Sequence, residues 1–304
     1  MARRFAGCPA QDNMSTHEHW IELDGQRMRY VRGGSGPPLL LVHGLLGGLF
    51  CWRFNIPALA EHYTVYAVDL PGSGLSDAPA NTDCGMQRQA ERLNDFIEKL
   101  QLDQVNVLGS SFGGGVAMFL AARHANRLRS LVLAAPVNPW SSFGRGRINF
   151  LNTVLGGYLL RMTMPLSRPV HRMAISRMYG DPRRMRPGTV EGYGRLIQMR
   201  GKMPNLLNTL KNWQNDMQAL ETAVSRIPLP TLLIWGTRDG AVDLHSATIL
   251  KQHLSRAELI TLPGVGHIPS EEVPEEFNRL VVEFLSHPER GELLPNTDSA
   301  QQGV

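Results

Sequence analysis

Cysteine is scarce in this sequence of 304 residues. The three that occur, Cys8, Cys51 and Cys84, are odd in number and widely spaced, which excludes a disulfide framework and a C-x-x-C metal knuckle. A chain without such cross-links is typical of a reducing compartment, so we expect the protein in the cytoplasm. The histidines also lack metal-binding spacings such as H-E-x-x-H. We therefore predict no metal and no cofactor.

Long apolar runs and a large overall charge are missing too. No apolar stretch approaches the roughly 18 residues that a membrane-spanning helix requires. The formal net charge is only +4, which gives no reason to expect a nucleic-acid partner. Hydrophobic residues, in contrast, make up 42% of the chain against 19% charged residues, so there is ample material for a packed core.

The mild net charge conceals an uneven distribution along the chain. Residues 137–227 contain 14 Lys and Arg against four Asp and Glu, a net charge of +10, whereas the remainder carries −6. One interpretation is that these arginines lie on solvated helix faces. The other is that a basic segment attracts an anionic substrate or makes peripheral contact with an anionic membrane.

Short apolar runs alternate with helical patterns along most of the chain. A hairpin around Asp24-Gly25 comes first and is followed by six runs typical of buried strands, at 39–42, 64–68, 105–108, 131–135, 231–235 and 258–262. Apolar residues spaced by three or four predict helices over 87–100, 112–124, 244–254 and 274–285. This alternation predicts an α/β fold with a mostly parallel sheet and helices on both faces.

One long segment interrupts the alternation and divides the chain. Residues 137–227 contain no convincing strand pattern, which predicts an all-helical cap inserted between two strands of the sheet. The catalytic core then comprises residues 17–136 and 228–286. We expect residues 1–16 to form a flexible arm and the polar residues 287–304 a disordered tail.

The strongest chemical signal is Gly109-Ser110-Ser111-Phe112-Gly113, which fits the pattern G-x-S-x-G. It follows an apolar run and precedes a helix, the context in which this pattern forms a sharp turn that exposes the central serine. The serine lies at the edge of the sheet and near the positive end of the helix dipole. Ser111 is therefore the predicted nucleophile.

A serine hydroxyl needs a base, and the base needs an acid that orients it. His267 follows the run at 258–262, and Asp239 follows the run at 231–235. The order Ser111, Asp239, His267 is the one that this strand–turn–helix layout requires. Asp243 is the competing acid, but its position directly before a helix indicates an N-cap.

Acyl transfer also needs two N–H donors for the developing oxyanion. The residue after the nucleophile, Phe112, supplies one. The loop that follows the run at 39–42 reads His43-Gly44-Leu45 and predicts Leu45 as the second donor. His43 is interpreted as a structural histidine that holds this loop.

Together these motifs resemble the α/β-hydrolase superfamily, over roughly residues 20–286. The resemblance implies an eight-stranded, mostly parallel sheet, a helical lid after the sixth strand and a Ser-His-Asp triad. Ser111 stands where haloalkane dehalogenases and epoxide hydrolases carry aspartate, which argues against their chemistry. The elbow is similar to that of meta-cleavage-product hydrolases, but Ile268 and Pro269 follow His267 where those enzymes typically carry a tryptophan. The region after His267 is more similar to carboxylesterases and lipase-like members.

We therefore predict an enzyme that cleaves small-molecule carboxylic esters. The alternatives are a C–C bond hydrolase, a lyase that uses the same triad, and a ligand-binding member of the fold without catalysis. The acyl pocket is predicted to be lined by side chains from the cap and from the loop after the third strand, although each of these also fits an ordinary core position: Trp52, Trp140, Trp213, Met162 and Met164.

Overall fold

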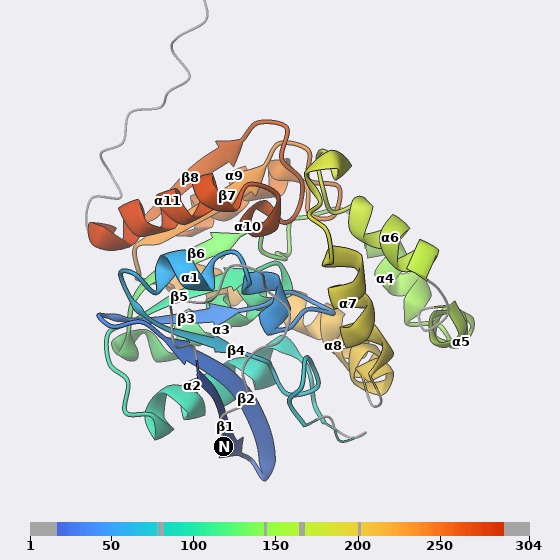
Figure 1. The fold of residues 1–304 in the computed structure, drawn as a ribbon, viewed down its shortest axis with the longest axis horizontal. Helices are drawn as coiled ribbons and strands as arrows, with labels where there is room; N and C mark the ends of the chain where they lie inside the picture. Colours follow the sequence, from blue (N-terminus) through green and yellow to red (C-terminus); the bar gives the residue numbers. More distant parts are fainter. Residues whose placement is uncertain are drawn as a thin grey trace, which may run out of the picture.

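A computed structural model describes most of the chain (Figure 1), and the described residues are 17–77, 79, 82–142, 145–163, 168–199 and 202–288. The predicted arm, 1–16, lies outside the described residues, as does the predicted tail apart from positions 287 and 288. No helix in the described part of the chain is long and apolar enough to cross a bilayer.

Eight strands form one sheet in the order β1-β2-β4-β3-β5-β6-β7-β8. Pairing is antiparallel between β1 and β2 and between β2 and β4, and parallel everywhere else. The predicted α/β class with a mostly parallel sheet is therefore confirmed. The strands are β1 His17–Leu23, β2 Gln26–Gly33, β3 Pro38–Val42, β4 Thr64–Val68, β5 Val105–Ser110, β6 Leu128–Ala134, β7 Thr231–Gly236 and β8 Ala257–Leu262.

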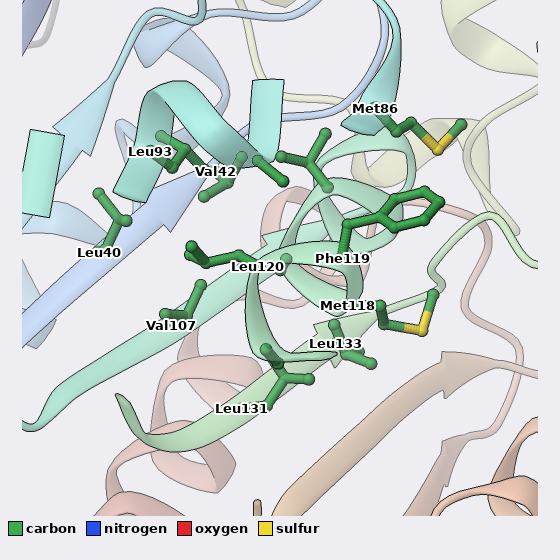
Figure 2. Packing of buried hydrophobic residues seen from close by; sticks show 14 of the residues in the cluster. Leu40, Val42, Met86, Leu93, Val107, Met118, Phe119, Leu120, Leu131 and Leu133 are labelled. Atoms are coloured by element: carbon green, nitrogen blue, oxygen red, sulfur yellow. The ribbon is translucent and has the colours of Figure 1, made fainter. Parts of the chain in front are cut away.

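Helices cover both faces of the sheet because successive strand residues point to opposite sides and are apolar on both. On one face Leu40, Val42 and Val107 pack under α2 Met86–Lys99, α3 Phe112–His124 and α9 Leu244–His253. On the other face Leu39 and Leu41 pack under α1 Ile56–Leu59 and α11 Pro274–Ser286. Figure 2 shows residues of the first of these layers, among them Phe119 of α3 and Met86 of α2.

The central helix α3 is buried on all sides along its first ten residues. Its three leading glycines explain how it packs so closely. A Cβ atom at Gly114 would meet Pro136 Cβ at 2.5 Å, and one at Gly115 would meet Met86 Sδ at 2.6 Å. Small residues at these positions therefore bring the start of the helix, and with it Ser111, against the neighbouring loops.

Between β6 and β7 the chain forms helices and no strand in its described portion. Figure 1 shows this helical insertion beside the sheet, with α7 and α8 nearest to the core and α4, α5 and α6 at the periphery. We call α4–α8 the cap. Its helices are α4 Arg145–Leu151, α5 Val154–Thr163, α6 Arg168–Ser176, α7 Thr189–Gln198 and α8 Lys202–Ala223.

Candidate active site

Ser111 occupies a sharp turn between β5 and α3. Its backbone has φ 51° and ψ −115°, a conformation that a residue with a side chain rarely adopts and that stores strain. Glycines on either side make the turn feasible, because a Cβ atom at Gly109 would meet Gly113 O at 2.5 Å and one at Gly113 would meet Val42 O at 2.3 Å. The turn therefore depends on the G-x-S-x-G pattern.

Three side chains from separate loops meet at this turn. His267 Nε2 lies 2.9 Å from Ser111 Oγ, and His267 Nδ1 lies 2.8 Å from Asp239 Oδ2. His267 follows β8 and Asp239 follows β7, and both side chains are almost fully buried. Because the carboxyl ends of parallel strands share one edge of the sheet, residues far apart in sequence converge there.

The second oxygen of Asp239 is held by the backbone. Oδ1 accepts hydrogen bonds from the N–H groups of Ala241 at 2.8 Å and Val242 at 3.0 Å. The carboxylate is therefore fixed in an orientation that directs Oδ2 at the imidazole. Asp243 has a different task, since its Oδ1 accepts the N–H of Ser246 at 2.9 Å and caps α9, as its sequence position indicates.

The loop after β3 lies against the nucleophile. A Cβ atom at Gly44 would approach Ser111 Cβ to 3.3 Å, so only glycine allows the loop this close without displacement. Leu45 follows directly and lines the same cavity as Ser111. Phe112 is the first residue of α3, where backbone N–H groups have no partner within the helix. The two predicted oxyanion donors therefore flank the serine.

His43 holds this loop through both ring nitrogens. The backbone N–H of Leu70 donates to Nε2 at 3.1 Å, so the ring proton is on Nδ1, which donates to Gly44 O at 2.8 Å. Burial lowers the pKa of His43 below its ordinary value of 6.5, and the buried ring is neutral. His43 is thus a structural group and not a second base.

A neutral His43 makes folding pH-dependent. Below about pH 6.5 the unfolded chain binds a proton at His43 that the folded chain does not bind. The free energy of unfolding is therefore highest above pH 6.5 and decreases as the pH falls towards the lowered pKa of His43 in the folded state. In urea unfolding at several pH values, we expect His43→Gln to flatten this slope by up to about 1.4 kcal/mol per pH unit. The exposed His62 is the control, and His62→Gln should keep the parental slope. Equal slopes in both variants would contradict this role for His43.

A cavity of about 570 Å³ opens over Ser111 and His267, within the size range of small-molecule sites. It lies between the core and the cap helices α4 and α8. Its polar side chains include Asn138, Gln214 and Glu221, and no described Lys or Arg lines it. The apolar part of the wall comes from both the core and the cap: Leu45, Val137, Ile148, Trp213, Met217 and Val242.

The predicted pocket residues are only partly found there. Trp213 of α8 lines the cavity, as proposed for it. Trp52 instead lies fully buried in the core beside α1 and α11, and Trp140 stacks on His253 with ring centroids 4.2 Å apart. Met162 is 49% exposed on α5, and Met164 lies outside the described residues. A position in the cap, or near a loop of the site, was therefore not sufficient to predict which side chains face the cavity.

Sequence analysis missed the residues that join the cap to the histidine loop. Glu272 is buried, and its carboxylate accepts the N–H of Gly266 at 2.8 Å and that of Gly180, in the cap, at 2.9 Å. The N–H of His267 itself donates to the cap residue Met178, at 2.7 Å to its carbonyl oxygen. The cap therefore helps to position the loop that carries His267. A pair of glutamates soon after His267 was the only signal in the sequence.

The neighbouring Glu271 forms a second buried link. Its Oε2 lies 2.6 Å from Arg53 Nη2, and both side chains are almost inaccessible to solvent. The hydroxyl groups of the cap residues Tyr193 and Tyr179 also reach this carboxylate. Tyrosines of the cap are thus hydrogen-bonded to a buried ion pair of the core.

Comparison with known proteins agrees with this architecture. A family model described as alpha/beta hydrolase fold matches residues 37–274, and the chain belongs to that family. The relatives have diverse names. The chain is 27% identical to a 2-hydroxymuconate semialdehyde hydrolase of a Pseudomonas species, over 86% of this chain and 91% of the relative. It is 28% identical to haloalkane dehalogenase 2 of Mycobacterium bovis, over 87% and 93% of the two chains.

The fold of a solved structure is also similar to that of this chain. The crystal structure of a membrane phospholipase A, described as a bacterial virulence factor, superposes with a TM-score of 0.75 at 26% identity and covers 90% of this chain and 87% of its own. Hydrolase families with different substrates therefore share this fold, and the reaction has to be argued from the site.

Proposed function

We propose that this protein is a serine hydrolase that cleaves carboxylic esters through an acyl-enzyme. Ser111 is the nucleophile, His267 the general base and Asp239 the residue that orients His267 and stabilises its protonated form. The hydrogen bonds between the three side chains support these roles. Ser111 Oγ is bonded to His267 Nε2, which can take the serine proton, and His267 Nδ1 is bonded to Asp239 Oδ2.

The reaction follows from this arrangement. Ser111 Oγ attacks the ester carbonyl carbon while its proton moves to His267 Nε2, and the carbonyl oxygen becomes an oxyanion near the N–H groups of Leu45 and Phe112. The intermediate collapses, the ester C–O bond breaks, and the leaving alkoxide takes the proton from His267. Water then attacks the acyl group as His267 removes its proton, and that proton returns to Ser111 when the acid leaves.

The composition of the cavity wall is the observation that favours neutral esters. The substrate of a meta-cleavage-product hydrolase is an anionic dienol acid, as the resemblance implies. Among the described residues no Lys or Arg lines the cavity, whereas Glu221 does. Placing a carboxylate there without a cationic partner would cost free energy, since a buried charge needs a compensating group. A neutral acyl chain fits the mixed apolar wall.

Hydrolysis of a C–C bond is the second candidate. It is favoured by the 27% identity with a relative named as a 2-hydroxymuconate semialdehyde hydrolase. Residues Ile268 and Pro269, where those enzymes typically carry a tryptophan, count against it. The same three side chains serve either reaction, so the substrate decides between them.

Three substrates separate these functions. We expect hydrolysis of p-nitrophenyl hexanoate with kcat/KM at least about tenfold above that for the p-nitrophenyl monoester of adipic acid. The two esters share the six-carbon acyl chain and differ in one carboxylate, which the cavity does not neutralise. A dienol keto-acid should be cleaved more slowly than either. A dienol keto-acid turned over faster than the hexanoate would replace the ester assignment by C–C hydrolysis.

A binding protein without catalysis is the remaining alternative. Incubation with a fluorophosphonate separates the two, because only an activated serine forms a covalent adduct. We expect one adduct, on Ser111, and its absence would favour a ligand-binding role. The described thiols offer no competing nucleophile. Cys51 and Cys84 are buried, and burial raises the pKa of Cys84 to about 11. We propose the cytoplasm as the compartment, which these free thiols favour.

A further inference from the structure

The outer helices of the cap expose large apolar side chains to solvent. Nine such side chains are exposed in the described part of the protein, and seven of them lie between positions 150 and 173. Val154 is the extreme case, with 93% of its surface accessible. We call this set the outer cap surface, and it consists of Phe150, Val154, Leu155, Tyr158, Leu159, Met162 and Met173.

Helix α5 contributes most of this surface because almost none of it packs against the protein. Its only buried residue is Gly156. That glycine lies against α4, since a Cβ atom there would come within 2.0 Å of Phe150 O. The helix therefore rests on its glycine side, and most of its large apolar side chains are exposed, namely Val154, Leu155, Tyr158, Leu159 and Met162. Concentrated apolar exposure of this kind marks a site of contact with another surface.

The charged residues of the segment that forms the outer cap surface have one sign. Between positions 145 and 180 the sequence contains six arginines and no aspartate, glutamate or lysine. The side chains of Arg161, Arg172 and Arg177 are exposed. Arg168 is also exposed, and it pairs with Glu191 of α7. An apolar helix surrounded by arginines is complementary to a surface that combines hydrocarbon with negative charge.

From this combination we infer that the outer cap surface docks onto an anionic phospholipid bilayer, with α4–α6 lying in the headgroup region. Apolar side chains of α5 enter the hydrocarbon boundary while arginines contact lipid phosphates. A second copy of the chain is a poorer occupant, because two such surfaces would bring the exposed Arg161, Arg172 and Arg177 of both copies together, and the sequence between positions 145 and 180 has no aspartate or glutamate to compensate them. The proposed contact is peripheral, with the cap helices lying along the headgroup region.

Docking in this way brings the candidate active site close to lipid. Ile148 and Asn149 of α4 line the cavity that contains Ser111, whereas Phe150 on the same helix belongs to the outer cap surface. One short helix thus borders both the cavity and the docking surface. An ester partitioned into the bilayer would have a short path to Ser111. This last link, unlike the docking itself, rests on the proposed function.

Co-sedimentation with vesicles tests the docking directly. Full-length Ser111→Ala protein is mixed with phosphatidylcholine vesicles with or without phosphatidylglycerol, so that hydrolysis cannot alter the lipid. We expect clear binding to the mixed vesicles, at least about tenfold weaker binding to the neutral ones, and loss of binding at high salt. Replacing Arg161 and Arg172 together by glutamine should weaken binding about 25-fold, since each arginine near such a surface contributes about fivefold.

Matched variants keep the test specific to the outer cap surface. Val154→Asn with Leu155→Asn should lower binding at least tenfold, whereas Trp20→Asn, at an exposed apolar residue of β1, and Arg256→Gln, at an exposed arginine of the core, should leave it unchanged. Equal binding to neutral and anionic vesicles, or no effect of the Val154 and Leu155 changes, would overturn the proposal. The proposal would also be overturned if the protein bound no vesicles and formed, in analytical ultracentrifugation, a dimer that the Val154 and Leu155 changes abolish.

Discussion

Replacement of Ser111 by alanine is expected to lower kcat for p-nitrophenyl hexanoate by about 10⁴- to 10⁶-fold, the range found when a triad serine is removed. The physical reason is the loss of the attacking hydroxyl oxygen, which lies 2.9 Å from His267 Nε2. KM should change little, because the cavity walls remain. Steady-state kinetics of the parent and the variant at equal protein concentration measures both constants.

Ser110 provides the matched control for this experiment. It is the same residue type at the adjoining position, but it ends β5 and is buried in the sheet. Ser110→Ala should therefore keep kcat within about tenfold of the parent, since such a change at a buried site acts mainly through small shifts in packing. If Ser111→Ala kept more than a tenth of the activity, another residue would be the nucleophile.

Replacement of Glu271 by alanine is expected to lower the free energy of unfolding by about 3–5 kcal/mol. Glu271 and Arg53 form an ion pair of 2.6 Å that is almost inaccessible to solvent. Removal of the carboxylate leaves a buried guanidinium without a counter-charge, and it also removes the acceptor of the Tyr193 hydroxyl. Urea unfolding followed by tryptophan fluorescence measures the change.

Glu275 is a suitable control because it lies only four positions further along the chain but in solvent. It pairs with Arg186 at 2.6 Å, and its side chain is 78% exposed. Solvent screens such pairs, so Glu275→Ala should cost less than about 1 kcal/mol. A loss for Glu271→Ala as small as that for Glu275→Ala would mean that the buried pair does not stabilise the fold.

The elements of the core could be predicted because their signals are local. A buried strand such as β4, Thr64–Val68, is apolar on both faces and short, and α2 repeats apolar residues every three or four positions. The G-x-S-x-G pattern is local as well, although the backbone atoms that exclude a side chain at Gly113 belong to Val42 and His43. The candidate acid and base could be placed because each follows a recognisable strand.

The side chains that line the cavity could not be predicted from such local patterns. Trp52, Trp140 and Trp213 look alike in sequence, yet one lies in the core, one stacks on His253 and one lines the cavity. Which way a side chain faces depends on how the cap sits on the core, and no periodicity encodes that. The pairing of Glu271 with Arg53 and of Glu272 with Gly180 could not be predicted for the same reason, because these partners lie 218 and 92 positions away.

By itself the sequence determined the family, the order of strands and helices along the chain and the three candidate catalytic residues, because each of these depends on spacing within short segments. It also determined that the positive charge is concentrated in the cap. Only the tertiary structure decided that no described cation of the cap faces the cavity and that the exposed apolar residues gather on α4–α6. Burial and mutual distance are properties of the packed chain, and they arise only when segments far apart in sequence come into contact.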